Sequence, residues 1–309
     1  MADAGLSRSW RPAWPCPVAM NLAPYRHGGG DPTFARLSDS SFAMARHTPE
    51  GTGSIRIAPR TADGVVDAEA WGSGAEWLLE RLPRLLGADD DPSGFEPGHP
   101  RIAEAWRRHQ QWRIGASDAV FESLLPAVIE QKVTGQEAFA GYRNLVRRFG
   151  APAPGPVALK VRLAPDAATV RQIPSWEWLR LPVDQGRSRP LVRAATVAAS
   201  LERALSGGPE ALDRSLQALP GIGRWTSAEV RSRALGDADA VSFGDYHVAK
   251  DVGWALVGRE VDDDELEVLL EPYRGHRLRV QGLVGLAGLG RPRRGARMAP
   301  RTHLPGGYL

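Results

Sequence analysis

The feature of this 309-residue chain that most constrains its fold is the stretch 219–226, which reads Leu-Pro-Gly-Ile-Gly-Arg-Trp-Thr. Pro220 ends a preceding helix, because proline lacks a backbone N–H and clashes with the turn before it. Gly221 and Gly223 allow a tight turn and leave backbone N–H groups uncovered at the start of a following helix, where an anion can bind. The stretch predicts an anion-binding hairpin between two helices. The alternative is a simple turn that joins two packed helices.

The residues on both sides of this hairpin favour helices. Apolar residues recur at helical spacing before it, with Pro209 at a suitable first-turn position, and after it as far as Gly236. The helix-hairpin-helix unit is therefore predicted over about residues 210–236. Asp245 lies twenty residues after Trp225 and follows a Phe-Gly bend, which suits it to be the N-cap of the next helix.

This pattern resembles the helix-hairpin-helix (HhH-GPD) superfamily of DNA base-excision glycosylases, and within it the DNA-3-methyladenine glycosylase II (AlkA-type) branch. The similarity extends over roughly residues 31–286 and includes 130–135 (Glu-Gln-Lys-Val-Thr-Gly), 174–178 (Pro-Ser-Trp-Glu-Trp) and 270–274 (Leu-Glu-Pro-Tyr-Arg). Non-catalytic DNA-binding proteins also use such a hairpin, so the resemblance depends on its combination with Asp245 and the Gln-Lys-Val-Thr turn. The resemblance implies an α+β protein with a small antiparallel-sheet domain followed by a mostly α-helical HhH-GPD glycosylase core.

Asp245 is the candidate catalytic residue, because the resemblance gives the acid at this place that role. Breaking an N-glycosidic bond leaves positive charge on the sugar, which a nearby carboxylate stabilises. The carboxylate can also orient or deprotonate the attacking water. A plain N-cap is the alternative role for this residue.

Four residues are candidates for the wall of a base pocket: Trp225, Trp176, Trp178 and Glu229. Bifunctional members of the superfamily carry a nucleophilic Lys at the place of Trp225, so the resemblance implies a monofunctional enzyme that leaves an abasic site. An indole face attracts a positively charged alkylated base by about 0.5–2 kcal/mol, although Trp225 can equally be a core residue.

Glu229 departs from the family pattern, which often has an aromatic residue one turn after the Trp. It either faces away or gives the pocket an acidic wall. Trp176 and Trp178 are two residues apart and cannot share a helix face, so at least one is expected in the core.

The expected DNA contacts come from the hairpin and from the turn at 130–135: Gly221, Ile222, Gly223, Arg224, Thr226, Gln131 and Lys132. In the family, the residue at the place of Lys132 fills the gap left by the extruded base and is typically apolar. Lys132 can fill it with its methylenes, or it is simply an exposed lysine. The resemblance also implies a Na⁺ or K⁺ ion on the backbone carbonyls of Gln217, Leu219 and Ile222.

Composition limits the other classes of function. The net charge is +3, and Lys132, Lys160 and Lys250 are the only lysines among 39 basic residues. Arginine suits phosphate because its planar fork donates two hydrogen bonds at once, but GC-rich codon usage explains the bias equally well. One cysteine, Cys16, excludes an internal disulfide and a four-cysteine iron–sulfur cluster. We expect no cofactor beyond the monovalent ion, no membrane span, a cytoplasmic location, a monomer, and double-stranded DNA with a damaged base as the partner.

The chain divides by composition into four parts. Residues 1–30 are rich in Pro and Gly and are expected to be a disordered arm. Residues 31–98 form the α+β domain, with strands expected at 41–46, 54–58 and 65–70 and a polar linker at the acidic triplet 89–91. Residues 99–290 form the helical core. Residues 291–309 form an Arg-rich tail without acids, which can add salt-sensitive attraction to DNA.

The sequence therefore favours a monofunctional glycosylase that flips out and hydrolytically releases alkylated purines of the 3-methyladenine or 7-methylguanine type. Two alternatives remain. One is a non-catalytic protein that recognises DNA or DNA damage through the hairpin. The other is a glycosylase for a neutral, oxidised or deaminated base.

Overall fold

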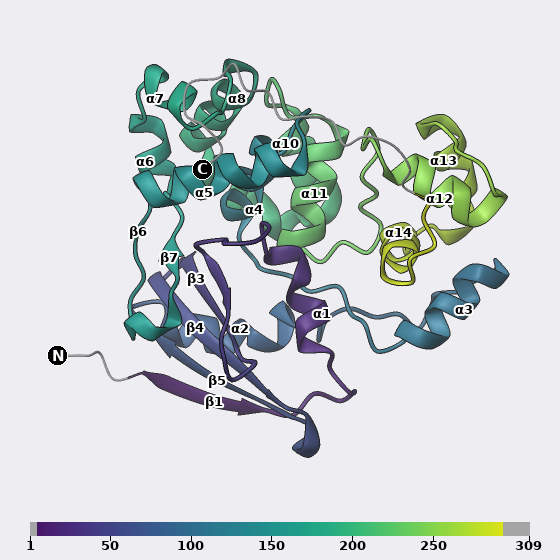
Figure 1. Ribbon diagram of the computed structural model, residues 1–309, viewed down its shortest axis with the longest axis horizontal. Helices are drawn as coiled ribbons and strands as arrows, with labels where there is room; N and C mark the ends of the chain where they lie inside the picture. Colours follow the sequence, from purple (N-terminus) through teal and green to yellow (C-terminus); the bar gives the residue numbers. More distant parts are fainter. Residues whose placement is uncertain (1–4, 293–309) are drawn as a thin grey trace.

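A computed structural model describes residues 5–292, in which an antiparallel sheet lies on one side of a helical body (Figure 1). The sheet has the strand order β1-β5-β4-β3-β2. Its strands are β1 Leu6–Trp10, β2 Phe34–Arg36, β3 Phe42–Thr48, β4 Gly51–Arg60 and β5 Val65–Trp71. A separate short pair joins β6 Ala151–Pro152 to β7 Arg162–Leu163. The predicted α+β fold class is confirmed.

The central strands form where apolar and polar residues alternate. In β4, Ile55 and Ile57 are fully buried, whereas the guanidinium of Arg56 between them pairs with Asp39 and Glu69 on the opposite face. The helix α2 Ala75–Leu85 packs on the apolar face with a buried stripe that includes Leu78 and Leu82. The alternation thus sets which face of the sheet meets a helix.

Residues 5–30 do not form the disordered arm that their composition predicts. β1 is an edge strand that pairs with β5 from Leu6 opposite Ala70 to Trp10 opposite Val66. The helix α1 Val18–Leu22 then buries Val18 and Leu22 in the core of the sheet. The prediction was wrong because prolines and glycines lie between these elements, and the sheet supplies the hydrogen bonds and apolar contacts that order them.

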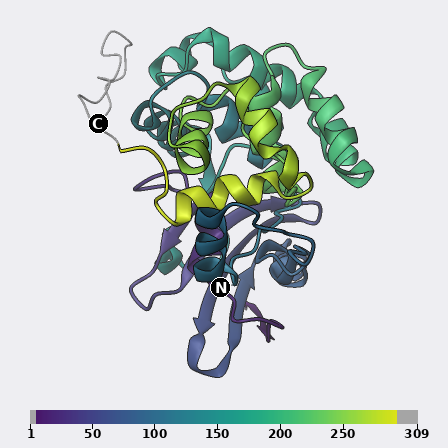
Figure 2. The same cartoon turned by 90° about the vertical axis from the view of Figure 1, so that its right-hand side faces the viewer.

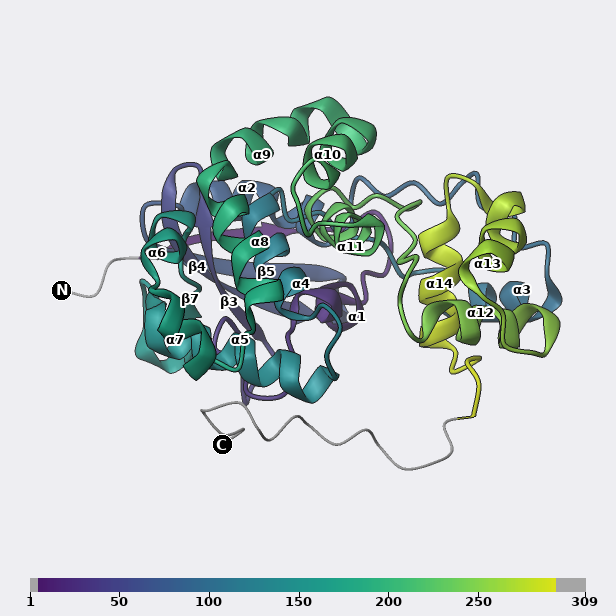
Figure 3. The ribbon, with the colours of Figure 1, turned by 90° about the horizontal axis from the view of Figure 1, so that it is seen from above.

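The remaining helices form the body above the sheet and a group at one end of the molecule (Figures 2 and 3). They are α3 Pro100–His109, α4 Val120–Ile129, α5 Gly135–Phe149, α6 Ala167–Gln172, α7 Ser175–Arg180, α8 Gln185–Thr196, α9 Ala198–Ala204, α10 Gly208–Gln217, α11 Arg224–Ala234, α12 Val248–Val257, α13 Asp263–Leu270 and α14 Arg277–Leu286. Short 3₁₀ turns lie at Ala23–Tyr25, Thr61–Asp63, Val157–Leu159, Leu205–Gly207 and Glu271–Tyr273. Across residues 5–292, none of the helices combines the length and the apolar character needed to span a bilayer.

The helical part contains two separate hydrophobic clusters. One is centred on α4 and includes α5, α8, α10 and α11. The other joins α3 to α12, α13 and α14, although more than a hundred residues separate them in the sequence. Along the chain, α3 belongs to the second cluster, the helices from α4 to α11 belong to the first, and α12, α13 and α14 belong to the second again.

The second cluster contains a buried ion pair that the sequence did not predict. Asp90 belongs to the acidic triplet expected to be solvated, yet its side chain is 2% exposed and pairs with the fully buried Arg279 of α14 at 2.6 Å. Asp90 also accepts a hydrogen bond from the backbone N–H of Ile114. This carboxylate thus ties the segment before α3 to α14. Most of the predicted Arg-rich tail, residues 293–309, lies outside the described residues.

Removing one partner of this pair is expected to destabilise the protein strongly, because the other charge stays buried without compensation. We expect Arg279→Met to lower the free energy of unfolding by about 3–5 kcal/mol, and the double variant with Asp90→Asn to lose less than the sum of the two single changes. Urea unfolding measures all three. Arg107→Met, which breaks an exposed pair with Glu104, is the control and should cost less than about 1 kcal/mol. Strictly additive losses would contradict the coupling.

Candidate functional site

The hairpin has the geometry predicted for it, with one difference between its two glycines. Gly221 has a φ of 95°, which favours glycine, and a Cβ on it would lie 2.3 Å from Pro190 of α8. Gly223 is extended, with a φ of −107°, so its backbone does not require glycine. A Cβ on Gly223 would meet nothing within 4 Å, and no side chain caps the N-terminus of α11. The first N–H groups of α11 are therefore open to an anion.

Two of the predicted DNA-binding side chains are internal and hold the hairpin in place. Ile222 is 5% exposed and packs in the α4-centred cluster. Thr226 is also buried, and its Oγ1 accepts a hydrogen bond of 2.8 Å from the side-chain amide of Gln131. The same amide donates to the Gly221 carbonyl at 3.0 Å. Gln131 thus joins the turn after α4 to the hairpin.

Lys132 is exposed at the tip of this turn and has a left-handed φ of 54°. This conformation is sterically unfavourable for a lysine, and the hydrogen bonds of the neighbouring Gln131 offset that cost. Thr134 begins α5 with a reciprocal capping box, in which its Oγ1 and Glu137 exchange hydrogen bonds. The ammonium of Lys132 has no acidic partner in residues 5–292. The fixed turn therefore presents a free positive charge beside the hairpin.

The turn at Gly244, the residue before Asp245, lies next to Trp225. Gly244 has a φ of 86°, and a Cβ on it would lie 3.9 Å from the Cβ of Trp225. Asp245 is partly exposed, and its Oδ1 accepts hydrogen bonds from the backbone N–H groups of His247 at 2.6 Å and Val248 at 3.0 Å. Its side chain thus bonds the N-terminus of α12, but the N-cap position is His247, two residues after the predicted one. The capping uses one carboxylate oxygen and leaves the acid accessible.

Trp225 and Glu229 lie one helical turn apart on α11. Trp225 is partly exposed, while its indole N–H is buried and lacks a hydrogen-bond acceptor in the described part of the chain. Glu229 is not a free acid: its carboxylate pairs with Arg233 at 2.6 Å and accepts a hydrogen bond from Ser242 at 2.5 Å. The positive charge of Arg233 thus compensates the negative charge of Glu229 on the same helix, α11.

Trp176 and Trp178 do not join this group. Trp178 is 3% exposed and packs in the α4-centred cluster, whereas Trp176 is 62% exposed. Both lie on α7, which Figures 1 and 3 show well away from α11 and α12. The structure therefore does not support either tryptophan as a wall of a pocket beside Trp225. The sequence expectation that at least one is a core residue fits Trp178.

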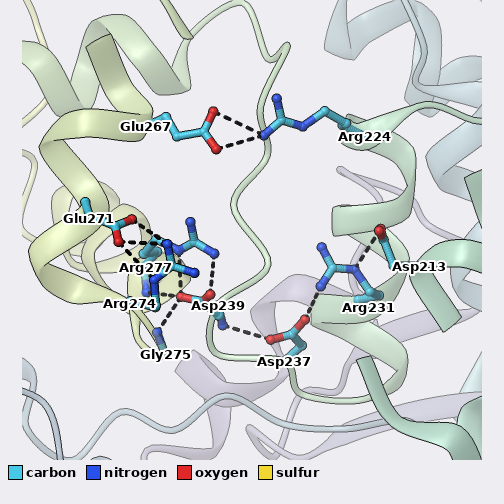
Figure 4. A network of polar contacts seen from close by, with 10 residues as sticks. All are labelled: Asp213, Arg224, Arg231, Asp237, Asp239, Glu267, Glu271, Arg274, Gly275 and Arg277. Atoms are coloured by element: carbon cyan, nitrogen blue, oxygen red, sulfur yellow. Dashed lines mark hydrogen bonds and ion pairs between the residues drawn. The ribbon is translucent and has the colours of Figure 1, made fainter. Parts of the chain in front are cut away.

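The segment from 235 to 247 connects the two helical clusters and thereby sets the distance between Trp225 and Asp245. Figure 4 shows how carboxylates fix its first part. Asp237 pairs with Arg231 of α11 and accepts a hydrogen bond from the N–H of Asp239. Asp239 accepts hydrogen bonds from the Arg277 guanidinium at 2.8 Å and from the Gly275 N–H at 2.7 Å, at the start of α14. One short run of chain is thus bound to both clusters.

Arg224 also bridges the two clusters, from the exposed start of α11 (Figure 4). Its guanidinium lies 4.5 Å from the centre of the Phe243 ring and 3.5 Å from the carboxylate of Glu267 on α13. Both charged side chains are about half exposed. Such a pair contributes little to stability, so Arg224 remains free to exchange its partner for a phosphate.

Sequence reasoning missed Ser242 and Asp263, which bond the turn that carries Asp245, and Arg233, which pairs with Glu229. Asp263 accepts a hydrogen bond of 2.9 Å from the N–H of Gly244. Ser242 lies three residues before Asp245 and is 2% exposed. The spacing of Glu229 and Arg233, one helical turn apart with opposite charges, was the available signal that Glu229 is paired.

Two cavities lie elsewhere in the described structure. One of about 50 Å³ lies between the sheet and α4 and α5, and includes His27, Arg46, Glu122 and Tyr142 in its lining. The other, of about 330 Å³, lies between α3 and the residues after α14. Neither is lined by Trp225 or Asp245. No group of His, Cys, Asp and Glu side chains suited to a metal ion is found within residues 5–292.

Comparison with solved structures identifies proteins with the same fold. The chain is similar to a 3-methyladenine DNA glycosylase from Archaeoglobus fulgidus, with a TM-score of 0.76 and 18% identity over 90% of this chain and 97% of that one. It is also similar to MBOgg1 in complex with a low-affinity DNA ligand, with a TM-score of 0.72 and 13% identity over 93% and 98% of the two chains.

A Clostridium acetobutylicum 8-oxoguanine glycosylase/lyase in complex with double-stranded DNA follows, with a TM-score of 0.68 and 12% identity over the same shares of the two chains, 93% and 98%. A scan against protein-family models and a search of curated proteins each find no match. At such identities the shared property is the fold of these DNA glycosylases.

The Asp239–Arg277 pair predicts how stability depends on pH. Burial by itself raises the pKa of the Asp239 carboxyl, but hydrogen bonds from Arg277 and Gly275 hold this pKa below its ordinary value of 3.8. A lowered carboxyl pKa stabilises the folded state above the unfolded pKa, and this contribution is lost as pH falls through the folded pKa.

We therefore expect Asp239→Asn to be less stable than wild type near about pH 7, and the difference to shrink below about pH 4. Urea unfolding across this range measures it. A difference that stays constant down to about pH 3 would mean that the carboxylate does not stabilise the junction.

Proposed function

We propose that this protein is a monofunctional DNA glycosylase that extrudes a damaged nucleotide from duplex DNA and hydrolyses the bond between its base and deoxyribose. The observation that carries the proposal is the close approach of Gly244, the residue before Asp245, to Trp225 in the first turn of α11, whose N-terminus has no side-chain cap. A phosphate on that N-terminus holds the backbone of a nucleotide. The accessible acid is then close to the sugar of that strand, which is the arrangement that the chemistry needs.

In this proposal Asp245 is the catalytic residue. As the glycosidic bond breaks, the sugar gains positive charge, and the carboxylate stabilises it electrostatically. The two N–H groups that bind Oδ1 fix the orientation of the carboxylate. The remaining oxygen is available to orient the attacking water. The reaction leaves an abasic site and an intact strand.

Trp225 supports the monofunctional assignment, because an indole cannot form a Schiff base with the sugar. It also supports an alkylated purine as substrate, since a positively charged base gains about 0.5–2 kcal/mol over an indole face. Glu229 adds nothing to this preference, because its charge is already balanced by Arg233. The proposed substrates are purines of the 3-methyladenine and 7-methylguanine type.

The proposed DNA interface consists of the N–H groups of Gly221 and of Gly223 to Thr226, together with the side chains of Arg224 and Lys132. Lys132 is proposed to fill the space left by the extruded base with its methylenes and to pair with a phosphate. Gln131 acts by holding Lys132 and the hairpin together. Residues 291–309 are proposed to add salt-dependent attraction to DNA through their arginines.

A Na⁺ or K⁺ ion is proposed on the carbonyls of Gln217, Leu219 and Ile222. The donor set fits, because neutral carbonyl oxygens suit a weakly bound monovalent ion. The Leu219 carbonyl accepts a hydrogen bond from the N–H of Ile222 at 3.0 Å. Within residues 5–292, the turn and loop backbone hydrogen bonds do not involve the carbonyls of Gln217 and Ile222. Such an ion would strengthen the local field that attracts a phosphate.

We also propose that the chain consists of a sheet domain up to residue 98 and a helical core to residue 290, and that the protein is a monomer in the cytoplasm.

A rival function is that of a non-catalytic DNA-binding protein. One observation favours it: neither of the two cavities described above is lined by Trp225 or Asp245. Base release from duplexes that contain alkylated, oxidised or deaminated bases distinguishes the rival and the neutral-lesion alternative from the proposed activity.

Asp245→Asn tests the catalytic role. We expect release of alkylated base to fall by about 100-fold or more, because the stabilising charge is lost, while duplex affinity at fixed salt is retained. Base release by chromatography and binding by fluorescence anisotropy measure the two effects. Asp264→Asn, which changes an exposed acid at the start of α13, is the matched control. Release at the wild-type rate by Asp245→Asn rules out the mechanism.

The presence of a tryptophan at position 225 gives a second prediction. When native protein is incubated with damaged duplex and sodium borohydride, no covalent protein–DNA adduct should form, since Trp225 cannot make an imine. Gel electrophoresis detects such adducts, and a known glycosylase/lyase serves as the positive control. A trapped adduct would show that another amine of the chain attacks the sugar.

A further inference from the structure

We infer that Glu229 is a positioning residue for Asp245, acting through Ser242, and is not part of a pocket wall. This inference rests on the proposed function, because it concerns the placement of the proposed catalytic acid. It assigns a role to the residue at which the sequence departs from the pattern of similar glycosylases.

The two oxygens of Glu229 have different partners on different elements. Oε2 pairs with the Arg233 guanidinium at 2.6 Å, within α11. Oε1 accepts the hydroxyl hydrogen of Ser242 at 2.5 Å, which lies thirteen residues away in the loop before α12. Arg233 is itself held by the carbonyls of Pro24 and Glu229 at 3.0 Å each. The carboxylate is thus fixed on one side and reaches the loop on the other.

Ser242 connects the carboxylate of Glu229 to the turn that carries Asp245. The N–H of Asp245 donates to the Ser242 carbonyl at 3.1 Å, so the two residues form one turn. Ser242 is also bound to α14, because its N–H donates to the Gln281 side chain at 3.1 Å and its Oγ accepts from the Gln281 amide at 3.2 Å. The hydroxyl of Ser242 therefore lies where α11, the loop and α14 meet.

A third helix completes the support of the loop. Asp263, at the start of α13, accepts the N–H of Gly244 at 2.9 Å. The residue before Asp245 is thus tied to α13, and Ser242 is tied to α11 and α14. Among the hydrogen bonds of Ser242, Gly244 and Asp245, that from Glu229 connects the loop to α11, the helix that carries Trp225. The other contacts with α11 lie at Asp237, which pairs with Arg231, and at the Phe243 ring, which Arg224 covers. Loss of the bond from Glu229 should let Asp245 move relative to a phosphate-bound nucleotide.

The test is a double-mutant cycle of Glu229→Gln, Ser242→Ala and the double variant. Glutamine keeps the volume of Glu229, but one of its two terminal atoms is an amide nitrogen, which donates and cannot accept, so the bonds that Oε1 and Oε2 accept from Ser242 and Arg233 cannot both be kept in their present geometry. Misplacement of a catalytic group lowers the rate of the chemical step more than ground-state binding. We expect kcat for base release to fall by about tenfold in each single variant, with KM for the damaged duplex unchanged within about twofold. The double variant should be no slower than the slower single variant.

Ser232→Ala is the matched control, since the Ser232 hydroxyl bonds the Glu229 carbonyl within α11 and does not reach the loop. It should leave kcat unchanged. Losses in kcat that multiply in the double variant would overturn the inference. A change in which base Glu229→Gln releases, with Ser242→Ala unaffected, would also overturn it and make Glu229 a pocket residue.

Amide hydrogen exchange over residues 241–247 tests the positioning without any enzymatic activity. We expect exchange about tenfold faster in Glu229→Gln and in Ser242→Ala, and unchanged exchange in Ser232→Ala. If native protein releases no base, the proposed function fails, and exchange still decides whether Glu229 holds the loop. Exchange at the native rate in both loop variants would refute the inference in either case.

Discussion

The arrangement of the candidate site depends on the attachment of one segment, residues 235–247, to two hydrophobic clusters. Trp225 lies on α11, a helix whose Val230 and Ala234 pack in the α4-centred cluster, whereas Asp245 precedes α12, which belongs to the cluster with α3 and α14. Nothing in either cluster alone fixes their separation. The carboxylates of Asp237 and Asp239 bind the segment to α11 and α14, and Ser242 binds it again nearer to Asp245. Charge-assisted hydrogen bonds suit this task because they are short and directional.

The sheet supports the helical body through polar contacts more than through shared apolar core. The Arg46 guanidinium of β3 pairs with Glu122 of α4 at 2.9 Å, and His27 lies 3.1 Å from Glu130 at the end of α4. Burial by itself raises the pKa of Glu130, but the hydrogen bond and charge of His27 hold it below its usual range. Glu130 precedes Gln131 directly, so the N-terminal part of the chain reaches the turn that presents Lys132. The sheet thus contributes to the alignment of the proposed DNA interface.

The fold is shared with structures described as acting on a methylated base and on an oxidised base, so fold alone does not identify a substrate. The proposal for this chain therefore rests on the residues at the junction. In the proposal, Trp225 occupies the place at which a strand-cleaving glycosylase would need an amine. Glu229 is paired and directed to the loop, and Lys132 is held in a left-handed conformation at the tip of a turn. These residues define the chemistry that the proposal assigns to the protein.

The sequence by itself determined the elements whose signals are local. Alternation around Arg56 predicted the central strands, and Pro220 with Gly221 predicted the hairpin, because proline and a left-handed glycine restrict the backbone wherever they occur. It also indicated that Asp245 caps a helix. Tertiary structure alone decided the rest. Residues 6–10 became a strand because β5 offered an open edge, and Asp90 became buried because Arg279 lies opposite it. Trp178 packs in the core, and Glu229 bonds Ser242. These side chains have partners that are distant in sequence, so tertiary packing decides them and no local pattern predicts them.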